Sequence, residues 1–307
     1  MRADAVLLAT GSRARRMPGF EGDGVYYLRS RDDAEALRAA LTPGSRVVLV
    51  GGGFIGGEVA SGALDLGAEV TILEAGPAPL AQALGARLGT AYAVLPRAAG
   101  VDVRVNTAVE GLRRDGTTLV VTTSQGDVPA DAVVVGIGTE PNIEIAVDSG
   151  IDVDGGVIVD ERCRTSVERV FAAGDVARHA HPGVGAQVRV EHFDQASRHG
   201  GTAARSMLGD EVRYDDPHWF WSDQFGHNLQ YVGRAGVADR MVVRGSLEEE
   251  SWTAFFVDGD RVSAAFSLDS GEDIAVAREL ISARVTLPDE VLADMDVDLF
   301  EACEEAL

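Results

Sequence analysis

Short, continuous runs of apolar residues recur along the chain, each stopped by small residues or a turn. Runs of this kind are typical of strands buried on both faces of a parallel sheet. The expected strands lie at residues 4–9, 47–50, 69–73, 101–105, 108–113, 119–123, 131–138, 151–159 (two short strands) and 170–173. Helices are expected at residues 30–41, 58–66, 83–99 and 191–208. The alternation of strands and helices predicts an α/β fold.

The pattern changes at residue 219. From there on, aromatic strand-like runs dominate (WFWSDQ, LQYVG and WTAFFV), and Asp258-Gly259 predicts a hairpin turn. A last helix is expected at residues 273–282, followed by an acidic tail. This part of the chain predicts a separate C-terminal α+β domain.

The strand at residues 47–50 runs directly into a glycine-rich turn and a helix. Gly51, Gly53 and Gly56 have the spacing G-x-G-x-x-G. The first glycine permits a tight turn, the second lets the backbone approach a pyrophosphate, and the third allows the helix to pack closely on the strand. Because N–H groups at the helix N-terminus would meet the phosphates, the turn predicts a dinucleotide site of the Rossmann type.

Glu74 ends the second strand of this unit. A carboxylate at that place accepts hydrogen bonds from both hydroxyls of an adenosine ribose and repels a 2′-phosphate. Ala75 and Gly76 follow, rather than an arginine, which favours NADH over NADPH. The alternative is a glycine-rich turn in some other α/β protein. It is disfavoured because strand, helix, second strand and acid are all in place.

Composition and charge narrow the function further. The 307 residues are 46% hydrophobic and 25% charged, as in ordinary soluble proteins, and the length predicts two or three domains. The net charge of −22 argues against nucleic-acid binding. No apolar run reaches the roughly 18 residues needed to cross a membrane, and the N-terminus has no h-region, so the cytoplasm is the expected compartment.

The reactive side chains point to few other chemistries. Cys163 and Cys303 form no C-x-x-C motif, which argues against a redox-active dithiol. All 27 basic residues are arginine, which excludes catalysis by lysine. The six histidines are scattered, and His179-x-His181, expected in a loop, lacks the further ligands that a metal site needs.

Six motifs stand in the order found in the FAD-dependent ferredoxin reductases. They are ATG (9–11), GGGFIGGE (51–58), GIGTEPN (136–142), FAAGD (171–175), EHFDQA (191–196) and WFWSDQ (219–224). Over essentially its whole length the chain resembles the putidaredoxin and rubredoxin reductase group, within the pyridine nucleotide-disulfide oxidoreductase superfamily. The resemblance implies a flavoprotein that passes electrons from NADH through FAD to a ferredoxin- or rubredoxin-type iron–sulfur protein of an oxygenase system.

The resemblance also implies site residues. It gives Glu58 a catalytic role facing the nicotinamide, although a carboxylate near a helix start also stabilises the helix dipole. The implied NAD contacts are Gly51, Gly52, Gly53, Phe54, Ile55, Gly56, Glu74 and Gly138. The implied FAD contacts are Thr10, Gly11, Arg15, Gly174, Asp175, Phe193, Trp219 and Trp221.

Several of the FAD contacts have a structural alternative. Asp175 would bind a ribityl hydroxyl or cap a helix. Arg15 would lie near the adenylate half of the flavin or be solvated. Phe193 would lie beside the flavin, and Trp219 and Trp221 would close over it, although at least one tryptophan is expected in a hydrophobic core.

One departure concerns the FAD domain. Members of the family begin with a first Rossmann unit that has its own glycine fingerprint, whereas this chain has a single fingerprint, the one assigned here to NADH. The expected domains are therefore a remnant of the FAD-binding domain (1–19 and 143–211), the NAD-binding domain inserted in it (20–142) and the C-terminal reductase domain (212–307).

Three explanations of this departure are open: an incomplete sequence of a normal reductase, which is favoured, one piece of a split protein, or a flavin-free relic. The alternative functions are a flavoprotein NADH oxidase or peroxidase, which the WFWSDQ motif argues against, and a non-enzymatic, flavin-free NADH-binding fragment.

Overall fold

The computed structural model describes residues 3–236 and 239–307, which form two compact units. The small unit consists of Arg13–Thr139 together with Ser222–His227. The large unit contains the N-terminal residues up to Ser12, Glu140–Trp221 and Asn228–Leu307. Each unit has hydrophobic cores of its own.

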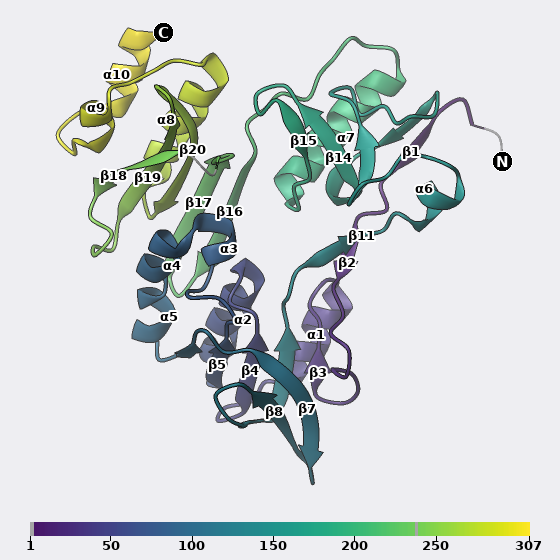
Figure 1. The fold of residues 1–307 in the computed structure, drawn as a ribbon, viewed down its shortest axis with the longest axis vertical. Helices are drawn as coiled ribbons and strands as arrows, with labels where there is room; N and C mark the ends of the chain where they lie inside the picture. Colours follow the sequence, from purple (N-terminus) through teal and green to yellow (C-terminus); the bar gives the residue numbers. More distant parts are fainter. Residues whose placement is uncertain (1–2, 237–238) are drawn as a thin grey trace. The chain divides into compact units, whose positions relative to one another are not determined.

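A five-stranded parallel sheet forms the centre of the small unit (Figure 1). In spatial order its strands are β3 (Val25–Tyr26), β10 (Ala132–Val135), β4 (Arg46–Val50), β5 (Glu69–Leu73) and β6 (Asp102–Arg104). Side chains of β4 alternate between two cores. Val47 and Leu49 share a core with residues of the helices α1 (Arg31–Ala40) and α2 (Phe54–Asp65), whereas Val48 and Val50 belong to the core on the other face. A strand covered on both faces explains the uninterrupted apolar run in the sequence.

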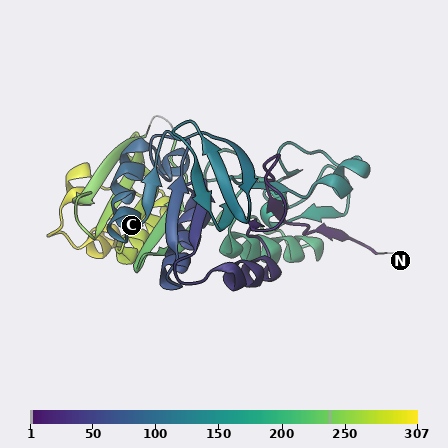
Figure 2. The same ribbon diagram turned by 90° about the horizontal axis from the view of Figure 1, so that it is seen from below.

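An antiparallel sheet supplies the other side of that second core. It contains β7 (Val109–Asp115), β8 (Thr118–Thr123) and β9 (Val128–Ala130). Leu119, Val121 and Val128 pack there against the central strands. In Figure 2 these teal strands and the purple helix α1 lie on opposite sides of the central sheet. The sequence predicts β7 and β8 but not β9, which is too short to form a recognisable run.

The single helix expected at residues 83–99 is wrong. The segment forms three short helices, α3 (Ala81–Leu84), α4 (Ala86–Tyr92) and α5 (Val94–Ala98). Gly85, with a φ of 83°, ends the first of them in a conformation that a helix cannot contain. The helix α4 passes so close to Pro79 that a Cβ at Gly89 would collide with the Pro79 carbonyl oxygen. The close packing of this segment therefore requires glycine at residue 89.

The large unit begins with a pair of parallel strands, β1 (Val6–Leu8) and β13 (Val170–Ala172). Its other elements before residue 219 are α6 (Glu144–Asp148), β12 (Val157–Val159), β14 (Ala177–His181), β15 (Ala186–Val188) and α7 (Phe193–Met207). The helix α7 runs through Gly200 and Gly201 without a break. Two expectations are corrected: the His179-x-His181 pair lies in strand β14 rather than in a loop, and only one strand, β12, together with an isolated bridge between Val153 and Val157, forms in residues 151–159.

The C-terminal part of the chain forms a five-stranded sheet covered by helices (Figure 1). Its strands, in spatial order, are β16 (Trp219–Gln224), β17 (His227–Gly233), β20 (Arg261–Leu268), β19 (Trp252–Asp258) and β18 (Arg240–Gly245). The helices are α8 (Gly271–Ala283), α9 (Asp289–Ala293) and α10 (Leu299–Ala306). The acidic tail folds into the helices α9 and α10, because Leu292, Leu299 and Cys303 are buried in the core and hold both helices in place.

Four strands carry the chain between the two units: β2 (Ser12–Ala14), β11 (Thr139–Pro141), β16 and β17. Among the residues that the structure describes, no helix combines the length and hydrophobicity needed to span a bilayer.

Candidate functional site

The turn between β4 and α2 has a backbone that requires glycine at two positions. Gly51 has a φ of 104°, and a Cβ there would lie 2.5 Å from the carbonyl oxygen of Gly136. A Cβ at Gly56 would collide with the carbonyl oxygen of Gly51. Gly53, in contrast, is the N-cap of α2, and a Cβ there would have no neighbour within 4 Å. The space in front of Gly53 is therefore open to a pyrophosphate approaching the helix N-terminus.

Glu74 follows β5 and turns back onto the glycine turn. Its Oε2 accepts a hydrogen bond from the backbone N–H of Gly52 at 2.8 Å, and its Oε1 accepts one from Gly76 at 2.6 Å. Each oxygen keeps a lone pair for another donor. The carboxylate is half-buried and fixed at the carboxyl end of β5, where it fits the hydroxyls of an adenosine ribose.

The order of the central strands makes this turn a topological switch point. β4 lies between β5 and β10, so the connections leave it on both sides, and dinucleotides bind at such a switch point. Gly138 follows β10 with a φ of 103°, and its carbonyl oxygen accepts a hydrogen bond from the Arg15 backbone at 2.9 Å. Phe54 and Ile55 begin α2, with Phe54 half-buried and Ile55 exposed. All the predicted NAD contacts therefore lie in the small unit.

Glu58 lies on α2, exposed, with its carboxylate held by a neighbour that the sequence does not predict. Ser222 Oγ donates a hydrogen bond to Glu58 Oε1. Behind it, Gln224 Nε2 donates to Ser222 Oγ at 2.7 Å, and the hydroxyl of Tyr92 donates to Gln224 Oε1 at 2.5 Å. A Cβ on Gly57 would collide with Gln224 Oε1 and would lie 2.5 Å from the Tyr92 hydroxyl, so the helix leaves room for this chain of bonds.

Part of this network could have been found in the sequence. Ser222 and Gln224 stand two apart in the WFWSDQ motif, and the period of a strand places both on one face. Tyr92 gives no such signal, because it is 132 residues from its partner Gln224.

Asp175, a predicted FAD contact in the large unit, is bound by Ser12, which directly follows the predicted contacts Thr10 and Gly11. Ser12 Oγ donates to Asp175 Oδ2 at 2.8 Å. Asp175 lies inside the 3-10 helix Gly174–Val176, whose N-cap is Ala173, so the helix-capping alternative for Asp175 is wrong. Gly174 has a φ of 75° and directs the chain through this turn.

Thr10 and Gly11 are tied to the segment that returns from the small unit. The Thr10 hydroxyl donates to the Asn142 carbonyl at 2.7 Å, the Asn142 side chain donates to the Thr10 carbonyl at 2.7 Å, and the Asn142 backbone donates to Gly11 at 2.9 Å. Arg15, another predicted FAD contact, is exposed and belongs to the small unit.

Aromatic side chains form the other part of the expected flavin site. Phe193 begins α7 and is 65% exposed, and its ring meets Trp221 edge-on with centroids 5.3 Å apart. The centroids of Trp219 and Trp221 are 4.8 Å apart. Trp219 packs on the C-terminal core and donates to Gln230 Oε1 at 3.1 Å, which agrees with the core alternative for one tryptophan. An exposed aromatic ring, a second ring at its edge and a carboxylate fit the isoalloxazine and ribityl parts of FAD.

Four of the six histidines pack together in the large unit, which corrects the expectation that they are scattered. His179, His181, His199 and His218 are buried around Tyr214. Nε2 of His179 lies 3.1 Å from Nε2 of His218. Within the described residues, no three His, Cys, Asp or Glu side chains have an arrangement that could hold a metal ion.

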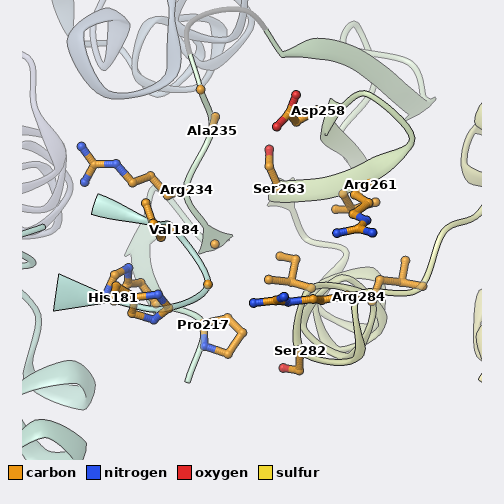
Figure 3. Close-up of a pocket in the computed structure, with 18 of the residues that line it drawn as sticks. His181, Val184, Pro217, Arg234, Ala235, Asp258, Arg261, Ser263, Ser282 and Arg284 are labelled. Atoms are coloured by element: carbon orange, nitrogen blue, oxygen red, sulfur yellow. The ribbon is translucent and has the colours of Figure 1, made fainter. Parts of the chain in front are cut away.

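The large unit also contains an open cavity of about 580 Å³ that is separate from every predicted site residue (Figure 3). Its lining includes Arg234, Arg261 and Arg284, and Arg284 reaches into the hollow towards Pro217. The charged lining is completed by three aspartates, Asp215, Asp239 and Asp258. The lining therefore carries no net formal charge.

Comparisons with known proteins agree with this geometry. A family described as pyridine nucleotide-disulphide oxidoreductase matches residues 1–200, and one described as reductase C-terminal matches residues 219–303. The chain is 42% identical over 298 residues to the ferredoxin–NAD(+) reductase component of the anthranilate 1,2-dioxygenase system of Burkholderia cepacia, covering 96% of this chain and 73% of that relative. It is 34% identical over 307 residues to putidaredoxin reductase of Pseudomonas putida, covering 97% and 73%.

Solved structures give the same result. The reductase in a covalent putidaredoxin reductase–putidaredoxin complex has a TM-score of 0.94 at 34% identity, covering 99% of this chain and 75% of that chain. The structure of Fdr9 has a TM-score of 0.89 at 40% identity, covering 97% and 76%. Two matching families in order, with relatives well above 30% identity, therefore show that this chain belongs to the pyridine nucleotide-disulphide oxidoreductase family and has its reductase C-terminal domain.

Proposed function

We propose that the protein is an NADH-dependent, FAD-containing ferredoxin reductase. The observation that carries this function is the turn Gly51–Gly56 with the Glu74 carboxylate fixed beside it, in a chain that matches ferredoxin–NAD(+) reductases over nearly its whole length. The electron acceptor is a ferredoxin- or rubredoxin-type iron–sulfur protein of an oxygenase system, in line with relatives that serve dioxygenases and with putidaredoxin reductase.

The NADH site is assigned to the small unit. The N-terminus of α2 at Gly53 receives the pyrophosphate, with Gly52, Phe54 and Ile55 around it. Glu74 accepts the hydroxyls of the adenosine ribose and excludes a 2′-phosphate. Gly138 lies on the opposite side of β4, towards the nicotinamide half, and Glu58 acts at the nicotinamide.

The FAD contacts are assigned to the groups around Asp175. Asp175, oriented by Ser12, binds a ribityl hydroxyl, Phe193 and Trp221 cover the ring system, and Thr10 and Gly11 line the approach. FAD held by these residues would supply hydride acceptance and one-electron release. The chain contributes binding, orientation and exclusion of water around the ring.

Thiol chemistry on the cysteines that this chain contains is disfavoured. Cys163 is fully buried, and burial raises the pKa of its thiol to about 12. Cys303 is buried in the C-terminal core, and burial raises its pKa as well. Neither supplies the reactive thiolate that an NADH peroxidase would use at neutral pH.

We further propose the domain division 1–19 with 143–211 (FAD), 20–142 (NAD) and 212–307 (reductase). It is supported by the compact small unit and by the reductase C-terminal match at residues 219–303. A cytoplasmic location is proposed because NADH is supplied there.

Two measurements test the function. Titration with NADH and NADPH, followed by calorimetry, should show a clear preference for NADH. Addition of FAD should then give a yellow protein that reduces a [2Fe–2S] ferredoxin in the presence of NADH. If the protein did not bind NADH, the proposed NADH site would be wrong. If the FAD-loaded protein bound NADH but did not reduce ferredoxin, the assigned reaction would be wrong.

A further inference from the structure

The carboxylate of Glu58 ends a chain of hydrogen bonds whose other members have no role assigned so far. Tyr92, Gln224 and Ser222 are each at most 2% exposed, whereas Glu58 reaches the surface. Buried polar side chains are retained where their bonds are made, and bonds in a low-dielectric interior hold their geometry firmly. The chain therefore connects a rigid interior to a single exposed carboxylate, entirely within the small unit.

The direction of the bonds follows from the chemistry of the groups. Burial and the nearby charge of Glu58 raise the pKa of Tyr92, so its hydroxyl stays protonated and donates to Gln224 Oε1. With Oε1 accepting, Gln224 Nε2 points the other way and donates to Ser222 Oγ at 2.7 Å and to the Phe54 carbonyl at 3.3 Å. The Ser222 oxygen is then an acceptor, so its own proton is left for Glu58 Oε1.

The position of Glu58 on α2 indicates which half of NADH its carboxylate would contact. Glu58 lies about 7 Å along the helix axis from Gly53, at 1.5 Å per residue, on the helix whose N-terminus receives the pyrophosphate. The adenosine half is directed to Glu74 on the β5 side, so the nicotinamide half leaves the pyrophosphate on the other side of β4. The nicotinamide carboxamide presents two N–H donors, which a fixed carboxylate oxygen can accept.

We infer that Tyr92, Gln224 and Ser222 are positioning residues that hold the Glu58 carboxylate as a fixed acceptor for the nicotinamide carboxamide. The inference rests on the proposed NADH site and adds the residues that orient its nicotinamide half. It also gives Gly57 a specific role, since any side chain there would collide with Gln224.

The experiment compares two ligands on the purified chain by calorimetry. NADH contains the nicotinamide, whereas ADP-ribose contains the same pyrophosphate and adenosine without it. Ser222→Ala is expected to weaken NADH by roughly tenfold while leaving ADP-ribose unchanged, as is typical for loss of a hydrogen bond to a charged group. Ser222→Thr keeps the hydroxyl and should restore most of the NADH affinity.

Gln224→Glu gives a second test, because it preserves shape and removes the amide donor. An ionised carboxylate at residue 224 accepts from both Tyr92 and Ser222, so Ser222 no longer donates to Glu58; the titrations are made in alkaline buffer, because burial raises the pKa of a carboxyl group. The ratio of NADH to ADP-ribose affinity should fall as in Ser222→Ala. Ser61→Ala is the matched control: it removes the acceptor of the Phe225 backbone N–H, at 2.8 Å in the same segment, without touching Glu58, and should leave the ratio unchanged.

The outcomes separate this inference from the proposed function. If neither ligand binds the unmodified chain, the NADH site itself is wrong. If both bind and the ratio is the same in Ser222→Ala, Gln224→Glu and the unmodified chain, the positioning role is wrong. A fall in the affinity of both ligands together would show a structural role for the network and would also overturn the inference.

Discussion

Single residues in the glycine turn combine structural and ligand-binding tasks to different degrees. Gly51 and Gly56 face backbone atoms, so their lack of a side chain is needed for the fold. Gly53 faces open space, so its lack of a side chain is needed only by something that approaches from outside. Glu74 does both, because its two oxygens close the turn through Gly52 and Gly76 and each keeps a lone pair for a ligand donor.

Gly53→Ala should therefore separate binding from folding. The helix start loses at most about 1 kcal/mol, since alanine is a poorer N-cap than glycine. NADH affinity should fall by at least roughly tenfold, because the added methyl group occupies the space where the pyrophosphate approaches. Gly56→Ala, compared by urea unfolding, should lower the free energy of unfolding by several kcal/mol. Equal destabilisation by the two variants would contradict this division of roles.

Glu74→Ala should change the choice between cofactors. Removing the carboxylate takes away the acceptor for the adenosine ribose and the repulsion of a 2′-phosphate, so NADH binding weakens more than NADPH binding. Calorimetric titration with both nucleotides measures the ratio. Glu69→Ala, at the exposed opposite end of β5, is the control and should leave the ratio unchanged. A ratio that stays constant in Glu74→Ala would count against the ribose assignment.

At the scale of elements, the sequence predicts those parts whose signal is local. The run at residues 47–50, the glycine spacing and the acid after β5 all lie within one β-α-β unit, so β4, α2 and β5 could be predicted. Contacts between distant segments could not. Tyr92 contacts Gln224, and His179 contacts His218, which is 39 residues away along the chain. No periodic pattern in the sequence predicts either contact. The helix expected at 83–99 is wrong because most residues of this segment favour a helix, whereas the positive φ of Gly85, which interrupts it, is not visible in the sequence pattern.

Arg244 links strand β18 to the helices of the C-terminal part of the chain. Arg244 is buried, pairs with Asp273 of α8 at 3.4 Å and donates to the carbonyls of Asp294 and Val297 between α9 and α10. Arg244→Leu should lower the free energy of unfolding by about 3 kcal/mol, because both carbonyls lose their donor and the half-buried Asp273 carboxylate loses its ion pair and keeps only the Thr253 hydroxyl. Arg240, on the same strand, forms an exposed ion pair with Asp289 at the start of α9, so Arg240→Ala should cost much less than Arg244→Leu. Urea unfolding of both variants checks the difference.

For the whole molecule, the two units can be observed separately. All three tryptophans (Trp219, Trp221 and Trp252) belong to the large unit, so their fluorescence reports its unfolding alone. The same unit contains the buried histidine group. Burial lowers the pKa of His179 to about 2, of His218 to about 3 and of His199 to about 4.

These pKa values predict that the large unit loses stability in mild acid. An unfolded histidine binds a proton below a pH of about 6.5, whereas the buried ones stay neutral, so the unfolded state binds more protons and is favoured as the pH falls. The contribution is fully present above pH 6.5 and is lost towards pH 4, with a slope of up to about 1.4 kcal/mol per pH unit for each histidine.

Tryptophan fluorescence in urea between pH 7.5 and 4.5 measures this slope. His199→Gln should reduce the slope by the share of one histidine, because a glutamine in its place binds no proton in either state. His227→Gln lies in the small unit and should leave the slope unchanged. A slope that is the same in His199→Gln and the unmodified chain would mean that carboxylates, rather than the buried imidazoles, control the acid sensitivity of the large unit.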